Sequence, residues 1–547
     1  MAERGVSKES KADRVERIKR EKDGLDVWDD ILRYSKLGHD AIDPEDFERF
    51  KWYGVYRQKP NDGHFMVRLR VPNGVLQAHQ LALIAEMTDR FARGYGDITT
   101  RQNIQLHWLT IEDIPYLLSR YHGVGLTTMA ACGDDPRNVV GCPVHGVDCG
   151  ELVDARPLLD DVNRLYVGNR EFSNLPRKFK VSISGCGVRC AQPEINDIGI
   201  SAVRRARAAG DEIGYEVAVG GGLSTVPRLA TRLEAFLTAE QVRPVCGAIA
   251  SIFREYGDRT KRTRARMKFL VEQWGGDRFL DEIQDRVDFA IDRDVPPLPE
   301  LPVDRDHIGV HPQRQEGYHY VGLASRFGRL TGAQMRDVAA IARELGDGTV
   351  RLTNNQNLIV TGVLTANVDE VVRRASNTLL PADADVWQRN FVACTGTQFC
   401  NLAITATKEA PGAESPAEHA LNALQERLGH FKEFVRINYN GCPNSCGQHW
   451  VADVGLQGVL LKAANGEQVE GALVTVGGGL GSESGFGRNI GVRLPLTEVP
   501  EALVRLFSAY EEHGAEDDSF RSWCQRTSDE ALGHYLRGEA LQPVDAG

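Results

Sequence analysis

The sequence predicts an α+β fold that is duplicated within one chain. Four segments recur in the same order at an offset of about 255 residues, and each copy alternates short strands with helices. A period this long indicates a duplicated pair of domains, because solenoid repeats are much shorter. The 547 residues also exceed what one hydrophobic core accommodates. We therefore expect two copies of a two-part unit.

The recurring segments identify corresponding elements of the two copies. RLRVPNGVL corresponds to GLASRFGRL, and TTRQNIQL corresponds to TNNQNLIV. SGCGVRCAQPEINDIG corresponds to NGCPNSCGQHWVADVG, and VAVGGGLST corresponds to VTVGGGLGS. In chain numbering, the pairs are 68–76 and 322–330, 99–106 and 353–360, 184–199 and 440–455, and 217–225 and 474–482.

Each copy is expected to begin with a small α+β part. A short strand leads into an amphipathic helix, predicted at 77–94 and at 332–345, and then into a strand that carries the RQN or NQN motif. The second part holds a cysteine segment between short strands, followed by VGGGL and a helix. The predicted divisions are an N-terminal arm at 1–48, small parts at 49–125 and 307–382, larger parts at 126–293 and 383–547, and a Pro-rich linker at 294–306.

Composition and charge narrow the class of protein. The chain is 42% hydrophobic and 26% charged, as in an ordinary globular protein, and its net charge of −11 gives no reason to expect nucleic acid binding. No stretch approaches the roughly 18 apolar residues needed to span a membrane. The polar N-terminus lacks the apolar segment of a secretory signal and reads as a solvated helix or arm. We expect a cytoplasmic protein.

Four of the eleven cysteines form two tight pairs late in the chain. The first pair is C-T-G-T-Q-F-C, which contains Cys394 and Cys400, and the second is C-P-N-S-C, which contains Cys442 and Cys446. Four thiolates from two loops suit a [4Fe–4S] cluster. A structural zinc site is the alternative, but its pairs are usually separated by about two to four residues, which fits the first pair poorly. A chance grouping of buried cysteines is the third alternative.

The paired cysteines and the segment N-G-C-P-N-S-C-G closely resemble the sulfite and nitrite reductase family. The resemblance extends from Arg49 to about Glu516 and includes both copies. It implies two ferredoxin-like half-domains plus two α/β siroheme/Fe–S domains around a pseudo-two-fold axis. It also implies a [4Fe–4S] cluster on the four cysteines and a siroheme whose iron shares Cys446 with the cluster.

Basic residues of the first copy match the substrate-binding positions of that family. They are Arg68, Arg137, Lys178 and Lys180, which would bind a small oxyanion and relay protons. Lys178 and Lys180 are two positions apart on a predicted strand, so they point to the same face. Without the resemblance, each would read as a solvated surface cation. The resemblance also implies siroheme contacts from Arg101, Gln105 and His107.

The two copies are expected to have different functions. Arg68, Arg101 and Lys180 correspond to Gly322, Asn355 and Arg436, so polar contacts change between the copies. We match Cys394, Cys442 and Cys446 with Cys132, Cys186 and Cys190, and place Asn138 opposite Cys400. The simplest interpretation of the first-copy cysteines is a three-thiolate remnant of a cluster site. A second cluster completed by Cys142 is the alternative.

One lysine favours sulfite over nitrite. Sulfite reductases of the family resemble K-x-K and many plant-type nitrite reductases carry K-x-N, whereas this chain has Lys178-Phe179-Lys180. A second cation suits the doubly charged sulfite ion, so we expect six-electron reduction of sulfite to sulfide, with nitrite reduction to ammonia as the alternative. Some bacterial sulfite reductases of the family carry a Tyr–Cys cross-link at positions that match Tyr56 and Cys132.

Two rival classes remain open on the sequence: a non-catalytic Fe–S electron carrier, and a siroheme-binding assembly or sensor protein. No flavin or nicotinamide domain is apparent in the sequence, so electrons should come from an external donor, and the family precedent is ferredoxin. The segment DRTKRTRARMK (258–268) carries six cations, and an exposed subset is expected to steer an acidic ferredoxin. The alternatives are a solvated helix face and pairing of some of these cations with siroheme carboxylates. We expect a monomer.

Overall fold

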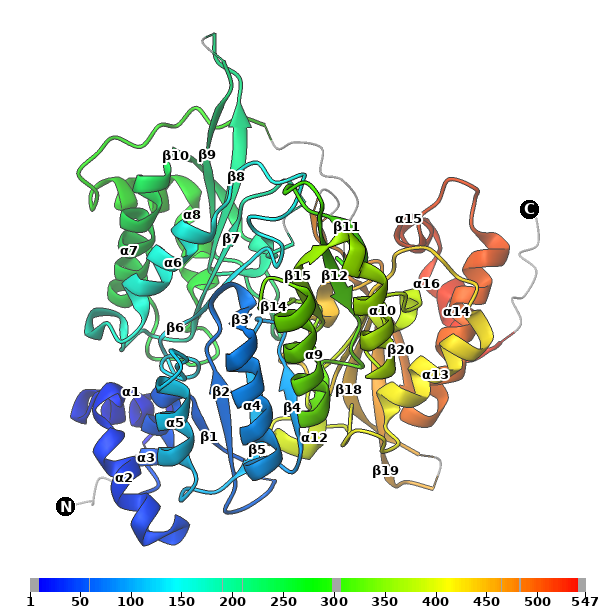
Figure 1. Ribbon diagram of the computed structural model, residues 1–547, viewed down its shortest axis with the longest axis horizontal. Helices are drawn as coiled ribbons and strands as arrows, with labels where there is room; N and C mark the ends of the chain where they lie inside the picture. The colour runs from blue at the N-terminus through cyan, green and yellow to red at the C-terminus, as the bar shows by residue number, and fades with distance from the viewer. Residues whose placement is uncertain are drawn as a thin grey trace, which may run out of the picture.

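The computed structural model describes residues 9–58, 60–188, 190–208, 210–297, 306–463, 465–481 and 484–539. Most of the predicted linker, 298–305, and both chain ends lie outside the described residues. In Figure 1 the first copy, coloured blue to green, occupies the left side, and the second copy, coloured green to red, occupies the right side. No helix of the described residues is long and apolar enough to cross a membrane.

Two five-stranded sheets belong to the ferredoxin-like half-domains. The first has the order β1-β2-β5-β4-β13 and the second has the order β11-β12-β15-β14-β3. The strands of the first sheet are β1 (Val55–Arg57), β2 (Phe65–Leu69), β5 (Ile104–Leu109), β4 (Tyr95–Ile98) and β13 (Arg329–Thr331). Those of the second are β11 (Gly309–Pro312), β12 (Tyr318–Leu323), β15 (Leu358–Leu364), β14 (Thr349–Leu352) and β3 (Val75–Gln77).

The half-domains exchange edge strands. Thr331 of β13 pairs with Tyr95 of β4, and Gln77 of β3 pairs with Thr349 of β14, so each copy completes the sheet of the other. The same reciprocity holds for side chains: Gln102 donates to the Leu352 carbonyl at 3.1 Å, and its counterpart Gln356 donates to the Ile98 carbonyl at 2.9 Å. Contacts of this kind are those of an isologous interface, and they confirm the expected pseudo-two-fold axis.

Helices α4 (Ala78–Phe91) and α9 (Gly332–Leu345) lie side by side between the two copies (Figure 1). Both begin with a capping box, from Gln77 to Gln80 and from Thr331 to Gln334. One hydrophobic core contains buried residues of both helices and both half-domain sheets. The helices predicted at 77–94 and 332–345 are confirmed. The outer helices of the half-domains are α5 (Ile114–His122) and α10 (Val368–Asn377).

The other two sheets form the α/β domains. Their orders are β10-β9-β8-β7-β6 and β16-β17-β18-β19-β20, with the first three strands of each domain parallel and the others antiparallel. The first domain has β6 (Pro136–Gly141), β7 (Phe179–Ser184), β8 (Ile198–Arg205), β9 (Glu212–Val219), β10 (Thr231–Leu237), α6 (Arg156–Tyr166), α7 (Ala239–Tyr256) and α8 (Met267–Gln284). The second has β16 (Phe391–Ala393), β17 (Ile437–Asn440), β18 (Val454–Lys462), β19 (Gln468–Val476), β20 (Arg488–Pro495), α11 (Val386–Arg389), α12 (Gly396–Phe399), α13 (Pro416–Leu428), α14 (Val499–His513), α15 (Phe520–Arg526) and α16 (Asp529–Arg537).

The N-terminal segment packs against the first copy. It forms α1 (Lys11–Glu21), α2 (Trp28–Leu37) and α3 (Asp46–Arg49). Helix α1 buries Val15, Ile18 and Lys19, and the Lys19 ammonium donates to the Leu175 carbonyl at 2.9 Å. The expectation of a solvated arm is therefore wrong for α1, because one face of the helix is buried and Lys19 donates a hydrogen bond to the segment before β7.

Candidate active site and cluster loops

The cysteine loops follow adjacent parallel strands. Cys394 comes directly after β16, and Cys442 lies two residues beyond the end of β17. The carboxyl ends of parallel strands meet at one edge of a sheet, where open α/β folds bind their ligands. Cys400 at the end of α12 and Cys446 in the β17 loop complete the set, and all four thiols line one cavity of about 390 Å³. The structure thus brings together the four cysteines that the sequence singles out.

The environment of these thiols fits a cluster better than a single ion. Among the described residues, no three of the four sulfurs lie within 4.8 Å of one another. A tetrahedral zinc ion with bonds of about 2.3 Å needs its sulfurs closer than this. Burial raises the pKa of Cys394 to about 12, so a cation must be bound for the thiol to ionise. The Gly441 N–H and the Asn444 amide donate to Cys394 and Cys442 at 3.2 and 3.5 Å.

Lys178, directly before β7, and Lys180, in β7, line the same cavity as the thiols. Phe179 between them is buried in the domain core instead, so the predicted common face is confirmed. Neither ammonium has a hydrogen bond or ion pair with the described residues. Burial, with Arg266 nearby, lowers the pKa of Lys178 to about 7. Burial and Arg101 lower the pKa of Lys180 well below its ordinary value. Cations held this way favour an anionic ligand.

Arg68 and Arg137 lie beside each other in the same cavity. The Arg68 guanidinium donates to Gln105 Oε1 at 2.9 and 2.6 Å and to the Ala131 carbonyl at 3.2 Å. Arg137 donates to the same carbonyl at 3.0 Å and to the Gly133 carbonyl. Both guanidinium groups are therefore held by hydrogen bonds within the chain, and both side chains line the cavity. The predicted residue Gln105 thus positions Arg68.

Arg101, one of the predicted cofactor contacts, is held by several hydrogen bonds. It donates to Asn196 Oδ1 and to the Asn138 carbonyl, each at 2.6 Å, while its Nε is buried with no partner among the described residues. Burial lowers its pKa to about 9. A guanidinium with an unused donor suits a bound acceptor such as a carboxylate of a ligand.

His107 lies in the wall of the cavity. Its ring stacks on Phe399 with centroids 3.8 Å apart, and its Nε2 lies 3.4 Å from Asp97 Oδ2. Burial lowers the pKa of His107, so the ring is neutral at neutral pH. The stacking holds Phe399, the residue directly before Cys400, against His107.

Tyr56 and Cys132 line the same part of the cavity. The Cys132 sulfur accepts a hydrogen bond from Arg68 at 3.2 Å. Burial raises the pKa of Tyr56, and the neighbouring Cys132 raises it too. The two side chains named as a possible cross-link therefore share one environment.

Further basic residues of the cavity are missed by the sequence prediction. Arg262 donates to both oxygens of Asp134 at 2.6 and 3.0 Å, and Lys19 of α1 lies 3.6 Å from the same carboxylate. Lys19 reaches the cavity only through the tertiary packing of α1, so no motif around it in the sequence predicts this position. Arg177 directly precedes the K-x-K motif, so the sequence prediction could have included it. The basic residues missed are Lys19, Lys22, Arg49, Lys51, Arg177 and Lys408, whereas Arg262 belongs to the basic run singled out in the sequence.

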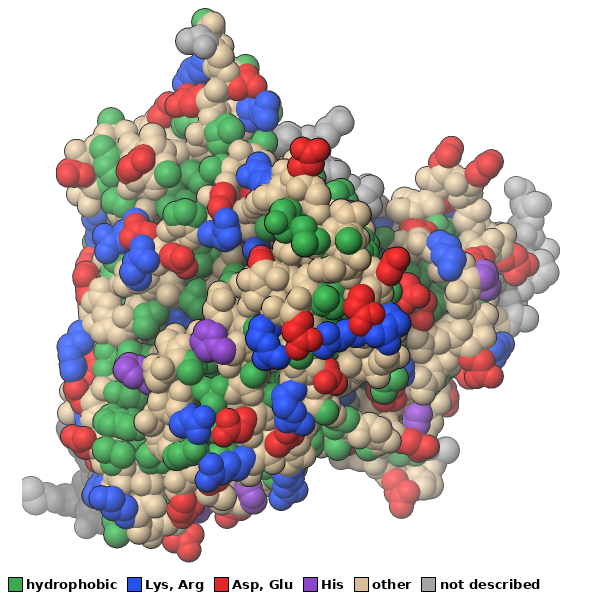
Figure 2. All heavy atoms as spheres, viewed as in Figure 1, with side chains coloured by type: hydrophobic (Ala, Val, Ile, Leu, Met, Phe, Trp, Pro, Cys, Tyr) green, Lys and Arg blue, Asp and Glu red, His purple; other side chains and the backbone are tan. Residues whose placement is uncertain are grey.

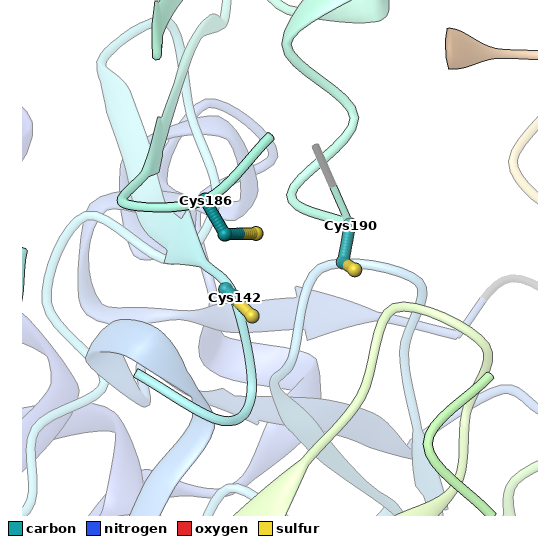
Figure 3. A group of neighbouring side chains, drawn as sticks. All are labelled: Cys142, Cys186 and Cys190. Atoms are coloured by element: carbon teal, nitrogen blue, oxygen red, sulfur yellow. The ribbon is translucent and has the colours of Figure 1, made fainter. Parts of the chain in front are cut away.

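The first copy has its own set of thiols, but it differs from the predicted one. Cys142 directly follows β6, as Cys394 follows β16, so Cys142 is the counterpart of Cys394. The sulfurs of Cys142, Cys186 and Cys190 lie within 4.8 Å of one another (Figure 3). Matching Cys132 with Cys394 is therefore wrong, because Cys132 precedes β6 and belongs to the cavity of the second-copy thiols. Asn138, inside β6, is likewise not opposite Cys400.

The cavity corresponding to the candidate active site is almost closed in the other copy. Its volume is about 20 Å³, and Asn355 and Arg436, the counterparts of Arg101 and Lys180, line it. The predicted difference in function between the two copies is consistent with this closure, because only one of the two equivalent positions has room for a cofactor.

The fold and the site define an iron–sulfur oxidoreductase built on a duplicated α+β scaffold. A family model for the nitrite and sulphite reductase 4Fe–4S domain matches residues 132–290 and 387–529. A model for the nitrite/sulfite reductase ferredoxin-like half domain matches residues 56–123 and 311–377. The chain belongs to the nitrite and sulphite reductase family.

Characterised relatives resemble nearly the whole chain. An assimilatory ferredoxin-dependent nitrite reductase of Haloferax mediterranei is 36% identical, with 96% of this chain and 93% of the relative covered. A ferredoxin–nitrite reductase of Synechococcus elongatus is 37% identical, with coverages of 91% and 96%. A ferredoxin sulfite reductase of Mycobacterium tuberculosis is 33% identical, with coverages of 94% and 95%. The solved NirA protein of Mycobacterium tuberculosis superimposes with a TM-score of 0.88 at 33% identity, covering 95% of this chain and 97% of that one.

Proposed function

We propose that the protein reduces sulfite to sulfide by six electrons, with ferredoxin as donor and with a siroheme coupled to one [4Fe–4S] cluster. One observation carries the proposal: a single cavity is lined both by the four cysteines and by Arg68, Arg137, Lys178 and Lys180. An electron carrier needs the thiols but not the cations. A siroheme assembly or sensor protein needs no group of cations at a reaction centre.

The residues present fit a siroheme. A cavity of about 390 Å³ is within the usual range for cofactor sites, and its buried cations need carboxylates such as those of this tetrapyrrole. Arg101 would hold one carboxylate, and Cys446, exposed at the cavity, would be the ligand shared with the cluster. When bound, the siroheme supplies the iron at which the anion receives electrons.

The chain itself supplies binding and protons. Arg68 and Arg137 would orient the oxyanion, because fixed guanidinium groups bind oxygen atoms at defined angles. Each oxygen of the substrate leaves as water, so protons must reach it. Lys178 would deliver them, since its lowered pKa makes the ammonium a good general acid near neutral pH. Lys180 would add the second positive charge that a doubly charged anion requires.

Nitrite is the second candidate substrate, and the relatives favour it. The two nitrite reductases above are 36% and 37% identical to the chain, whereas the sulfite reductase is 33% identical. The K-x-K motif supports sulfite. The test is to measure kcat/KM for both anions with one reduced dye as donor. The proposal predicts the larger value for sulfite, and a larger value for nitrite would assign the enzyme to nitrite reduction.

We also propose a thioether between Tyr56 and Cys132. Their shared cavity supports it. Forming the bond removes one hydrogen from the ring and one from the thiol and passes two electrons to an external oxidant such as dioxygen. Mass spectrometry of a tryptic digest should then show joined peptides that are two hydrogens lighter than their sum. Recovery of only the separate peptides from active enzyme would contradict the cross-link.

A further inference from the structure

The remnant thiols of the first copy form a compact group. Cys142 follows β6, and Cys186 and Cys190 occupy the loop after β7 (Figure 3). Their three sulfurs lie within 4.8 Å of one another and none is in a disulfide. Cys142 and Cys186 are buried. A single tetrahedral ion with metal–sulfur bonds of about 2.3 Å draws sulfurs to less than 4 Å apart, so a modest contraction would close a mononuclear site.

A histidine from the second copy lies beside this group, although not within 4.8 Å of all three sulfurs, so the contraction that closes the site must also draw in its ring. His307 Nε2 lies 3.1 Å from the Cys190 sulfur, and its Nδ1 lies 3.2 Å from the Tyr320 hydroxyl. A ligand histidine is commonly oriented by a partner on its other ring nitrogen, and Tyr320 occupies that position. Three cysteines and one histidine are a standard structural zinc set.

The position of His307 depends on the divergence of the two copies. Gly322 is the counterpart of Arg68, and a Cβ atom there would meet the His307 carbonyl oxygen at 1.8 Å. The loss of the arginine side chain is what admits the His307 backbone. The adjacent cavity of about 20 Å³ has space for about one water molecule and none for a tetrapyrrole.

A second iron–sulfur cluster fits this group poorly. Cys149 is the cysteine that follows Cys142 in the chain, but its exposed thiol lies 3.6 Å from the Pro312 carbonyl and outside the three-sulfur group. The thiols that line the active-site cavity are more widely spaced, as a cluster requires.

We propose that Cys142, Cys186, Cys190 and His307 bind one structural Zn²⁺ ion. The ion would tie the two cysteine loops of the first copy to the chain that enters the second half-domain at β11. It takes no part in electron transfer, because zinc has no accessible redox change. After the duplication, this cluster site would thus have become a structural zinc site that links the two copies.

The metal content of the holoenzyme tests this proposal. After exhaustive dialysis against EDTA, mass spectrometry of the metals should find about one zinc per chain in addition to iron. X-ray absorption at the zinc edge should show about three sulfurs near 2.3 Å and one nitrogen near 2.0 Å. These readouts do not depend on turnover, so they remain valid whether the substrate is sulfite, nitrite or neither.

Matched variants locate the ion. Cys186→Ser and His307→Gln should each lose most of the zinc, whereas Cys149→Ser and Cys246→Ser, which alter an exposed and a buried cysteine outside the group, should retain it. Zinc at background level in the wild-type enzyme would overturn the proposal even if the variants failed to fold. So would a shell without sulfur, iron in place of zinc, or a disulfide among Cys142, Cys186 and Cys190.

Discussion

Lys180 shows how one side chain can influence which anion the cavity prefers. Its backbone N–H donates to Asp197 at 2.9 Å, which fixes the start of β7, while its ammonium has no partner among the described residues. The charge is thus available to a ligand. The K-x-K motif predicted this orientation because alternate residues of a strand share a face.

Replacing Lys180 by Asn should lower sulfite turnover more than nitrite turnover. A hydrogen bond to a charged group contributes about 1.5–3 kcal/mol, so kcat/KM for sulfite should fall roughly 10- to 100-fold, with a smaller fall for nitrite. Steady-state rates with both anions measure this. Lys180→Arg is the control that keeps the charge. Equal losses for the two anions would show that Lys180 does not set the preference.

Site residues that belong to a sequence motif could be predicted from the sequence. Site residues that reach the cavity only through tertiary packing could not. Arg68, Arg101 and Lys178 were assigned because their motifs resemble those of the family, and all three line the cavity. Lys19 reaches it only because α1 packs against the first copy. In the basic run 258–268, Arg262 turned out to pair with Asp134, so its charge is used internally.

At the scale of elements, a buried ion triad joins both half-domains to the cluster loop. Asp97 of β4 binds Arg329 of β13 through two contacts of 2.9 Å and Lys408 at 3.1 Å. Arg329 also donates to Gln398 of α12, two residues before Cys400, at 2.8 Å. All three charged groups are almost fully buried, so each depends on the others for compensation.

Asp97→Asn should destabilise the protein by about 3–5 kcal/mol, because it leaves two buried cations without their carboxylate. Urea unfolding measures the change. The control is Asp89→Asn, which breaks the exposed Asp89–Arg336 pair between α4 and α9 and should cost only about 0–1 kcal/mol. Similar losses in the two variants would show that burial does not strengthen the triad.

The same triad predicts a pH dependence. Burial raises the pKa of Asp97, but Arg329 and Lys408 outweigh it and hold the pKa well below its usual value. Its stabilising contribution is therefore complete above the unfolded pKa of about 4 and is lost as the pH falls below that value. The difference in stability between wild type and Asp97→Asn should shrink with acidification through this range. A difference independent of pH would contradict the assignment.

The cluster loops give a further prediction at this scale. Cys446→Ser should disturb both iron centres, because Cys446 is the proposed shared ligand. Absorption and electron paramagnetic resonance spectra would show this, with Cys524→Ser, a buried cysteine of α15, as the control. A normal siroheme spectrum with normal activity in Cys446→Ser would contradict the bridge.

Element boundaries also explain an error of the sequence prediction. The repeat segments aligned correctly, but no motif fixed the equivalence of cysteines near β6. The structure does so through strand ends, since Cys142 and Cys394 each directly follow the first parallel strand of their sheet. Strand exchange between the half-domains could not be predicted either, because β3 and β13 have the same local pattern whichever sheet they join.

At the scale of the whole molecule, two equivalent positions have taken different roles. One keeps a cavity of about 390 Å³, and the other has closed to about 20 Å³. Near the axis the two copies still meet symmetrically: Gln448 donates to its counterpart Gln192 at 2.7 Å. The duplication was predictable from the sequence because both copies keep their motifs, whereas the closure depends on packing around Gly322.

Electrostatics of the whole molecule bear on the proposed donor. The net charge is −11, and acidic and basic side chains are interspersed on the face shown in Figure 2. Of the six cations in 258–268, Arg259, Arg262, Arg266 and Lys268 bind groups within the chain. Lys261 and Arg264 are exposed on either side of Arg262, which lines the cavity.

Replacing Lys261 and Arg264 by Glu should lower ferredoxin-driven turnover and leave dye-driven turnover unchanged, because the small dye needs no steering. The effect should weaken as salt rises, since the Debye length is about 8 Å at physiological ionic strength. The control variant replaces Lys462 and Arg493 by Glu, because both are exposed on β18 and β20 of the second copy. An equal fall with both donors would indicate a role in folding or cofactor binding instead.

The central claim is that the cavity carries a small anion through a six-electron reduction. The most direct test is the stoichiometry of anaerobic turnover by the purified holoenzyme with a reduced one-electron dye and a limiting amount of sulfite. Six equivalents of dye should be oxidised for each sulfide formed, with no intermediate oxidation state accumulating. Fewer electrons per sulfite consumed, or no reoxidation of the dye with either sulfite or nitrite, would contradict the claim.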